Sequence, residues 1–335
     1  MTMPPDHPPI PKPRIGVLLM NLGTPDAPDA KSVKRYLGQF LSDKRVIEIP
    51  SLLWQPILRG VILNVRPKKS AHAYAQVWRE DGSPLQAITT AQSQALKGRF
   101  GPDVLVDHAM RYGNPSIPDR LAAMKAAGCE RILLAPLYPQ YCAATTATAN
   151  DQAFAVLAGM RWQPALRTMP PYHDDPDYIA ALQTSIEAGL ATLDFEPERI
   201  IASFHGMPKR TLALGDPYHC QCQKTARLLA EAMGRPITIA FQSRFGPAKW
   251  LEPATDLTLA ALPAQGVRSV AVVAPGFSAD CLETLEEMAI RGRETFEEAG
   301  GERFAYLPCL NDSAVGVALL EKLVARELEG WMRPA

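Results

Sequence analysis

Two segments of this chain carry residue types suited to proton transfer and metal binding. In the first, residues 199–208, His205 follows an apolar run, and in the second, residues 269–287, Glu283 follows another. In a parallel α/β sheet the carboxyl ends of the strands open onto the ligand crevice. We therefore expect His205 and Glu283 to come from different strand ends and to face one bound molecule. A histidine opposite a carboxylate suits proton abstraction, metal binding, or both.

Two further carboxylates flank Glu283. Asp280 and Glu287 lie close enough in sequence that a helix would place all three on one acidic face. The favourable electrostatics of a helix N-terminus account for Asp280 and Glu283, but not for Glu287 one turn further in. We interpret the row as a relay that carries protons outward or passes a metal ion inward, and the sequence leaves these two directions open. Carboxylate and imidazole bind divalent transition-metal ions without holding them as tightly as thiolates.

The elements that position these residues follow an alternating pattern. Short β-rich runs alternate with longer helical ones, which is typical of parallel sheets covered by helices. The predicted strands are 15–20, 104–110, 131–137, 200–204, 237–242 and 269–274. The predicted helices include 91–99, 118–127, 178–192, 223–232, 257–265, 281–299 and 313–331. The pattern predicts an α/β fold of two similar Rossmann-like domains, each a parallel sheet flanked by helices, with the active-site cleft between them.

The chain divides at a proline-marked stretch around 167–172. We expect a loose N-terminal tail over 1–13, a first Rossmann-like domain over 14–168 and a second over 169–309. The last helix carries a one-sided apolar stripe. We therefore expect residues 310–335 to pack back on the body of the protein.

One apolar segment does not fit the alternating scheme. Residues 47–63 are rich in large apolar side chains but are interrupted by Pro50 and Pro56. Two interpretations stay open. The segment is either an ordinary buried helix, or an exposed apolar lip, over about 47–65, that holds a large flat ligand or touches a membrane.

Composition excludes several classes of protein. The 335 residues contain 35 Lys plus Arg and 35 Asp plus Glu, a balance that does not favour nucleic acid as a partner. No apolar run approaches the roughly 20 residues that span a bilayer. The six cysteines are too scattered for a disulfide framework, which predicts a reducing, cytosolic compartment. No Gly-x-Gly-x-x-Gly follows a strand, which argues against a dinucleotide-dependent oxidoreductase.

Eight short motifs occur in an order that is specific in combination. They are GVLLMNLGTP (16–25), GSP (82–84), RYG (111–113), YPQY (138–141), SFHG (203–206), GDPY (215–218), FQSRFGPAKWL (241–251) and GFSADCLETLEE (276–287). With these motifs the chain resembles the ferrochelatases, which insert ferrous iron into protoporphyrin IX in the last step of haem biosynthesis. The resemblance runs from about Arg14 to the final helix.

The resemblance implies roles for individual residues. His205 matches the family's active-site histidine, as pyrrole proton acceptor or iron ligand, and Glu283 matches its active-site glutamate. Asp280 and Glu287 match the acidic residues beside that glutamate. Porphyrin-binding positions are implied for Arg111, Tyr112, Trp250 and Phe277. The implied partners are protoporphyrin IX and ferrous iron as substrates, and no cofactor is required for the chemistry.

The cysteines raise a separate hypothesis. Cys220 and Cys222 form a close pair, and with Cys142 and Cys129 they supply enough thiols for a [2Fe–2S] cluster. The alternative is that all are reduced bystanders. Animal ferrochelatases bind such a cluster with three cysteines of a carboxy-terminal extension, to which the sequence up to Ala335 has no counterpart. We exclude a fifth thiol, Cys281, because it lies in the acidic motif, where many members have histidine.

Two other functions compete with iron insertion. One is a chelatase for another metal and tetrapyrrole, and the other is a non-catalytic porphyrin or haem carrier that uses the same cleft. The expected location is the cytoplasm, with peripheral membrane contact through the apolar lip as an open alternative. A homodimer is equally left open.

Overall fold

The structure is a computed structural model that describes residue 6, residues 12–246 and residues 248–332. The expected loose tail over 1–13 lies almost entirely outside the described residues, and so do the last three residues of the expected C-terminal segment.

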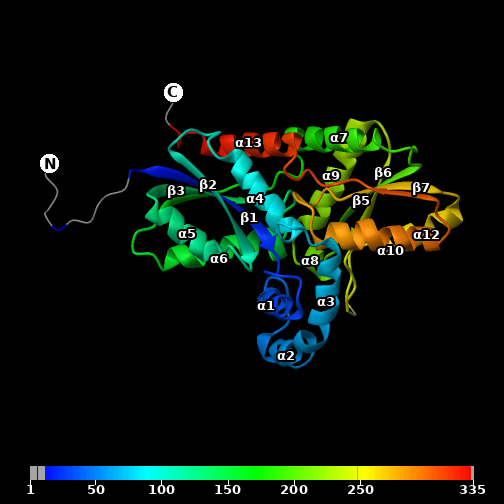
Figure 1. The fold of residues 1–335 in the computed structure, drawn as a ribbon, viewed down its shortest axis with the longest axis horizontal. Coiled ribbons are helices and arrows are strands. Elements are labelled where there is room, and N and C mark those ends of the chain that lie inside the picture. The colour runs from blue at the N-terminus through cyan, green and yellow to red at the C-terminus, as the bar shows by residue number, and fades with distance from the viewer. Residues whose placement is uncertain (1–5, 7–11, 247, 333–335) are drawn as a thin grey trace.

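Two four-stranded parallel sheets form the framework (Figure 1). The first has the order β2-β1-β3-β4 and consists of β1 (Arg14–Gly23), β2 (Val104–Tyr112), β3 (Cys129–Pro136) and β4 (Ala165–Thr168). The second has the order β6-β5-β7-β8 and consists of β5 (Arg199–His205), β6 (Ile237–Gln242), β7 (Ser269–Val273) and β8 (Arg303–Tyr306). Both halves therefore share one topology, and the predicted α/β fold with two similar parallel sheets is confirmed.

All six predicted strands are present, and the residues 237–242 match β6 at both ends. The sequence analysis missed the edge strands β4 and β8. Each has four residues, and β4 has no fully buried side chain. An edge strand pairs with a neighbour on one side only, and a run of this length contains few apolar residues. Its sequence pattern is therefore weak.

Helices cover both faces of each sheet. The outer face of the first sheet packs on α5 (Ile117–Ala126) and α6 (Thr148–Ala158). The outer face of the second packs on α10 (Thr255–Ala261), the π-helix η4 (Leu285–Gly292) and α12 (Arg293–Glu298). The inner faces share the helices α4 (Pro84–Leu96), α7 (Pro176–Leu190), α9 (Tyr218–Met233) and α13 (Ala314–Leu328).

Strand alternation explains how one sequence serves both faces of a sheet. In β1, Val17 and Leu19 point into the inner core, while Leu18 and Met20 point into the outer one. Successive side chains of a strand point to opposite faces, so a strand covered on both faces is apolar throughout.

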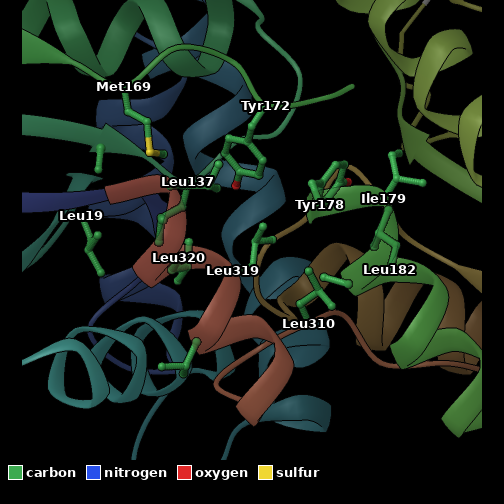
Figure 2. Packing of buried hydrophobic residues seen from close by; sticks show 14 of the residues in the cluster. Leu19, Leu137, Met169, Tyr172, Tyr178, Ile179, Leu182, Leu310, Leu319 and Leu320 are labelled. Atoms are coloured by element: carbon green, nitrogen blue, oxygen red, sulfur yellow. The ribbon is translucent and has the colours of Figure 1, made fainter. Parts of the chain in front are cut away.

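The inner core joins the two halves of the chain. Figure 2 shows Leu19 and Leu137 on one side and Ile179 and Leu182 on the other, with Leu319 of α13 between them. Helix α13 contacts α4 and β3 of the first half and α7 of the second. The C-terminal helix therefore packs across the boundary between the halves.

A separate lobe of helices projects from the body (Figure 1). It comprises α1 (Ala30–Phe40), α2 (Ser51–Ile57), the π-helix η1 (Leu58–Ile62) and α3 (Leu63–Val77). It has a small core of its own, built around Leu58 and Tyr74 and shared with Tyr112 of the first sheet. We call residues 47–65 of this lobe the apolar lip.

The lip is not an ordinary buried helix. Leu52 is 91% exposed and Leu53 is 65% exposed, and four further apolar side chains are exposed as well, those of Ile49, Ile57, Val61 and Val65. Leu58 alone of the large lip residues is fully buried, because it faces the core of the lobe. Among the described residues, none of the helices has both the length and the apolar character that a membrane span requires.

The remaining helical turns are short. They are the π-helix η2 (Ala143–Ala147), α8 (Lys209–Ala213), the 3₁₀-helix η3 (Pro263–Gln265) and α11 (Leu282–Thr284). The helix predicted over 281–299 is therefore divided into α11, η4 and α12, with a π-helix in its middle.

Candidate active site

His205 is the last residue of β5, where the strand opens onto the lobe formed by α1 to α3. Its Nδ1 lies 2.7 Å from the carbonyl oxygen of Gly206. A carbonyl only accepts hydrogen bonds, so Nδ1 carries the proton of the neutral ring. The lone pair therefore lies on Nε2, which is the nitrogen left free to accept a proton or to bind a metal.

Gly206 and Trp250 make the wall beside His205. The Gly206 backbone N–H donates to the carbonyl oxygen of Gln242 at 2.8 Å. A Cβ on Gly206 would lie 2.4 Å from that oxygen and 3.3 Å from the Trp250 ring. Only glycine allows this approach, so the indole of Trp250 lies directly against the strand end.

The loop that carries Trp250 reaches across to the lobe. The Trp250 indole N–H donates to the Phe245 carbonyl at 3.0 Å, and Arg66 of α3 stands over the Phe245 ring at 5.5 Å from its centroid. A second bridge joins Arg210 to Glu48 at 3.1 Å. These two bridges hold the apolar lip against the second half of the chain.

The acidic segment, residues 280–287, follows β7 and begins the π-helical region. The carbonyl of Glu283 accepts a hydrogen bond of 2.7 Å from the Gln242 side chain, and Gln242 is paired with His205 in the sheet register. Burial raises the pKa of the Glu287 carboxyl; the nearby charge of His205 opposes that rise, and the charge of Glu283 adds to it. The structure therefore places the backbone of the acidic segment at the end of β6, beside the strand end that carries His205.

Asp280 does not share the acidic face that helical spacing predicts. It precedes α11, is only 4% exposed, and accepts hydrogen bonds from the hydroxyls of Thr284 and Tyr306 and the amide of Asn311. A carboxylate enclosed by so many donors has a structural role, and it is separated from water. Spacing alone could not reveal this, because the partners come from distant segments.

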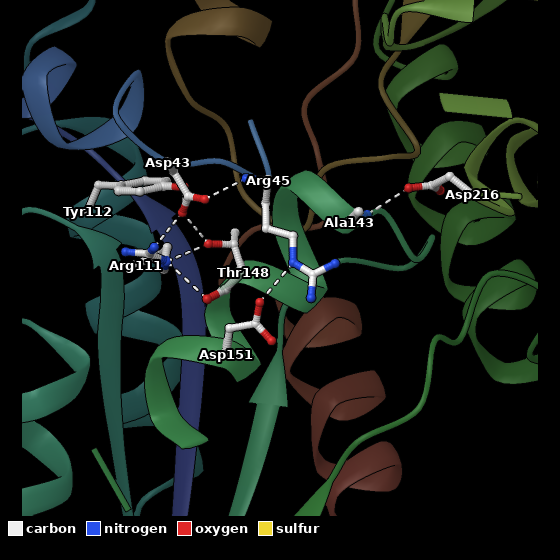
Figure 3. A network of polar contacts seen from close by, with 8 residues as sticks. All are labelled: Asp43, Arg45, Arg111, Tyr112, Ala143, Thr148, Asp151 and Asp216. Atoms are coloured by element: carbon white, nitrogen blue, oxygen red, sulfur yellow. Dashed lines mark hydrogen bonds and ion pairs between the residues drawn. The ribbon is translucent and has the colours of Figure 1, made fainter. Parts of the chain in front are cut away.

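Arg111 and Tyr112 lie at the end of β2 but serve a different partner from the one predicted (Figure 3). Arg111 pairs with Asp43 and donates from Nε to Thr148 Oγ1 at 2.7 Å. The Tyr112 hydroxyl donates to Asp43 at 2.8 Å, and its ring is 1% exposed. Both side chains therefore anchor the loop that leads into the apolar lip, and the Tyr112 ring is too buried to touch a ligand.

Asp43 is the centre of this network. Its carboxylate also accepts a hydrogen bond of 2.5 Å from the Thr148 hydroxyl and one of 2.7 Å from the backbone N–H of Arg45. Burial acts to raise the pKa of the Asp43 carboxyl, but these hydrogen bonds and the charge of Arg111 outweigh it, so the pKa lies below its ordinary value.

Phe277 and two tyrosines complete the surroundings of Glu283. Phe277 is partly buried and packs near Leu85. Tyr36 and Tyr74 meet edge to face with ring centroids 6.5 Å apart. Burial raises the pKa of both hydroxyls, and the charge of Glu283 adds to the rise. The sequence analysis did not select these tyrosines, since they lie on α1 and α3, far from any catalytic motif in the chain.

The comparisons with known proteins identify the family of this chain. The family model described as Ferrochelatase matches residues 14–328. The chain is 58% identical to the ferrochelatase of Rhizobium meliloti and 56% identical to that of Allorhizobium ampelinum, in each case over 98% of both chains. The chain belongs to the ferrochelatase family. The resemblance inferred from the eight motifs is thereby confirmed.

Solved structures of chelatases share the fold of this ferrochelatase. SirB from Bacillus subtilis with Fe³⁺ has a TM-score of 0.57 at 12% identity, covering 95% of this chain and 97% of that one. CbiX, described as the terminal enzyme for biosynthesis of sirohaem in denitrifying bacteria, has a TM-score of 0.52 at 12% identity, covering 94% and 100%. At this identity the likeness establishes the fold alone.

The family assignment establishes the reaction. This ferrochelatase is a lyase that inserts ferrous iron into protoporphyrin IX to form protohaem, with the metal ion as substrate and no cofactor in the chemistry. Within the described residues, no three His, Cys, Asp or Glu side chains converge as a ready-made metal site.

The four candidate cluster cysteines lie in three places. Cys142 and Cys222 belong to the inner core, where Ala143 N–H donates to Asp216 at 2.8 Å and Tyr141 N–H donates to Gln221 at 2.6 Å. Cys220, two residues before Cys222, is exposed. The structure thus brings the segment of Cys142 against the start of α9.

Cys129 is separated from the other three cysteines. It begins β3 and packs in the outer core, whereas Cys142 follows the opposite end of that strand. An eight-residue strand spans roughly 25 Å at about 3.3 Å per residue. Cys129 is therefore too far away to share a cluster with Cys142.

Proposed function

We propose that His205 is the group that accepts the pyrrole protons during iron insertion. Metallation removes two N–H protons from the macrocycle, so a base must stand where the ring nitrogens lie. The observation that carries the assignment is the hydrogen bond from Nδ1 to the Gly206 carbonyl, which in the neutral ring puts the lone pair on Nε2. Nε2 can equally bind the incoming ferrous ion before the transfer.

Glu283, with Glu287 behind it, would form the path to or from that centre. The support is that Gln242, the register partner of His205, donates to the Glu283 carbonyl, and that Ser243 donates to the Glu287 carboxylate. Asp280 is left out of this path because its oxygens are already occupied by Thr284, Tyr306 and Asn311.

The porphyrin would lie between two domains, residues 14–168 and 169–309, with Trp250 and Phe277 as ring contacts and the apolar lip over its vinyl edge. The supporting observation is the set of bridges from the lip to the second half, Arg66 to Phe245 and Glu48 to Arg210. A rigid seat that favours a buckled ring would expose the nitrogen lone pairs to the ion.

Anaerobic assays of variants test these roles. We expect His205→Ala to abolish haem formation from ferrous iron and protoporphyrin, while porphyrin affinity, measured by fluorescence quenching, stays within a few-fold. Glu283→Gln keeps the shape and removes the charge, and should lower kcat strongly. Equal loss of binding and turnover in His205→Ala would assign that residue a structural role. Binding without haem formation by the unaltered protein would favour the carrier alternative.

The apolar lip would also place the enzyme at a membrane surface from the cytoplasmic side. Leu52, Leu53 and Val61 are exposed. Residues 49–78 contain four Arg and Lys residues and no Asp or Glu. An apolar face with basic residues binds anionic lipid.

Vesicle binding tests the membrane contact. Cosedimentation with anionic phospholipid vesicles should be lost in a Leu52→Asp, Leu53→Asp double variant. It should be kept in Leu257→Asp, which changes a side chain 60% exposed on α10. Equal binding by both variants would remove the lip from membrane contact, and a change of sedimentation without vesicles would assign the lip to a homodimer instead.

A [2Fe–2S] cluster on Cys142, Cys220 and Cys222 remains a separate hypothesis. Its support is the contact between the Cys142 segment and the start of α9. Burial raises the pKa of the Cys142 and Cys222 thiols, which favours protonated thiols in the unliganded protein. Anaerobically purified protein should be red-brown and contain iron and acid-labile sulfide if the cluster exists. Colourless protein with titratable thiols would reject it.

A further inference from the structure

Two residues of the described chain that are not glycine adopt a left-handed backbone. They are Ser243, with φ of 65°, and Asn311, with φ of 52°. This conformation costs free energy for any residue with a Cβ, and it persists where surrounding contacts over-determine it. The two residues lie far apart in sequence, yet both bind the acidic segment, one at each end.

Ser243 holds the far end of the acidic segment. Its backbone N–H donates to Glu287 Oε1 at 2.7 Å, and its hydroxyl donates to Glu287 Oε2 at 2.5 Å. The preceding residue, Gln242, donates from its side chain to the Glu283 carbonyl. The left-handed turn at Ser243 is what aims the N–H and the hydroxyl at the same carboxylate.

Asn311 holds the near end through a reciprocal pair of hydrogen bonds. Its Nδ2 donates to Asp280 Oδ2 at 2.6 Å, and its Oδ1 accepts from the Asp280 backbone N–H at 2.7 Å. Its own carbonyl accepts from Gln92 of α4 at 2.9 Å. Asn311 thus connects the start of the acidic segment to a helix of the first half of the chain.

Glu283 lies between these two attachments. The helix there is π-helical from Leu285 onward, a form that is rare and is found mostly at functional sites. The carboxylate of Glu283 is not bound by Ser243 or Asn311. The polypeptide on each side of Glu283 is therefore held in place by hydrogen bonds.

We propose that Ser243 and Asn311 are positioning residues that fix the two ends of the acidic segment and so hold Glu283 at its working distance from His205. The inference rests on the proposed function of Glu283. It assigns Ser243 and Asn311 no contact with the substrates. Their effect on the reaction is through the placement of a carboxylate, for which an error of about 1 Å costs on the order of a hundredfold in rate.

Substitution by glycine distinguishes a residue that positions Glu283 from one that only forms a turn. Ser243→Gly accepts the left-handed backbone without strain and keeps the N–H, but removes the hydroxyl. We expect kcat to fall about tenfold or more, with the Tm and the porphyrin affinity close to those of the unaltered protein. Asn311→Gly should behave in the same way. If the residues only form turns, glycine would match or exceed the original in both activity and Tm.

Coupling and neighbouring controls sharpen the test. The double variant Glu287→Gln, Ser243→Gly should lower kcat by less than the product of the two single-variant effects, because both substitutions act on one contact. Arg244→Ala removes a surface pair with Asp256, and Asp312→Ala changes an exposed neighbour of Asn311. Both should retain kcat.

The outcomes distinguish this inference from the proposed function. If Glu283→Gln is inactive while Ser243→Gly and Asn311→Gly keep full kcat, the positioning role is overturned and the role of Glu283 stands. If Glu283→Gln is fully active, both fail. Should Asn311→Gly prove unstable, Asn311→Asp is the second variant. It keeps the shape and sets a carboxylate against Asp280, and full activity in it would equally overturn the inference.

Discussion

The hydroxyl of Tyr218 donates a hydrogen bond of 3.0 Å to the backbone carbonyl of His205. Tyr218 begins α9, so this bond ties the start of that helix to the end of β5. Tyr218 is buried in the inner core, and no motif spacing connects it with His205. The placement of His205, the proposed proton acceptor, therefore depends on a residue that contacts only its backbone.

Tyr218→Phe should lower kcat several-fold and destabilise the fold by about 1 kcal/mol, the usual net value of one hydrogen bond. Tyr138→Phe is the matched control, because among the described residues the Tyr138 hydroxyl has no hydrogen-bond partner. Haem formation and thermal denaturation measure both effects. An unchanged kcat in Tyr218→Phe would show that His205 does not need this bond.

Gly206→Ala should inactivate the enzyme and lower its Tm. The added Cβ would lie 2.4 Å from the Gln242 carbonyl, a backbone atom that cannot rotate away. Relief of that clash must move the end of β5 or of β6, and His205 with it. Gly60→Ala, where a Cβ meets nothing within 4 Å, should leave activity and Tm intact. A fully active Gly206→Ala variant would show that the strand end tolerates displacement.

Asp43→Asn should destabilise the protein by about 2–3 kcal/mol at neutral pH, because several donors lose a charged acceptor. Asp151→Asn, which removes an exposed pair with Arg45, should cost at most about 1 kcal/mol. Urea denaturation of the three proteins measures the differences. Equal effects of the two substitutions would contradict the buried network drawn in Figure 3.

The stability difference between the unaltered protein and Asp43→Asn should depend on pH. The pKa of Asp43 lies below its ordinary value of 3.8 in the folded protein. Its stabilising contribution is therefore complete above about pH 5 and is lost as the pH falls through the folded pKa. The difference in unfolding free energy between the unaltered protein and Asp43→Asn should be constant near neutral pH and shrink in acid. If this free-energy difference grows in acid, the pKa of Asp43 is raised in the folded protein and not lowered.

Two leucines of the apolar lip should respond oppositely to truncation. Leu58 is fully buried in the core of the lobe, so Leu58→Ala should cost about 2–5 kcal/mol by leaving a cavity. Leu52 is 91% exposed, and Leu52→Ala should change stability by less than about 0.5 kcal/mol. Thermal denaturation of both variants checks this, and a large loss in Leu52→Ala would mean that the lip is covered in solution.

Periodicity was sufficient to predict the six longer strands and the place of His205 at the end of one of them. Apolar runs such as 200–204 are continuous because both faces of a parallel sheet are covered, and the carboxyl ends of such strands meet at one edge. These are local regularities, and they are visible in a sequence without knowledge of its partners.

Only the tertiary structure decided what each polar side chain binds. Asp280 and Glu287 are both acidic residues of one short segment, yet Asp280 is enclosed by Asn311 and Tyr306, while the carboxylate of Glu287 is bound by Ser243. Arg111 was a plausible ligand for a carboxylate, and the carboxylate it binds is Asp43. A hydrogen bond depends on atoms from distant segments meeting within about 3 Å, and neither spacing nor composition determines which segments meet.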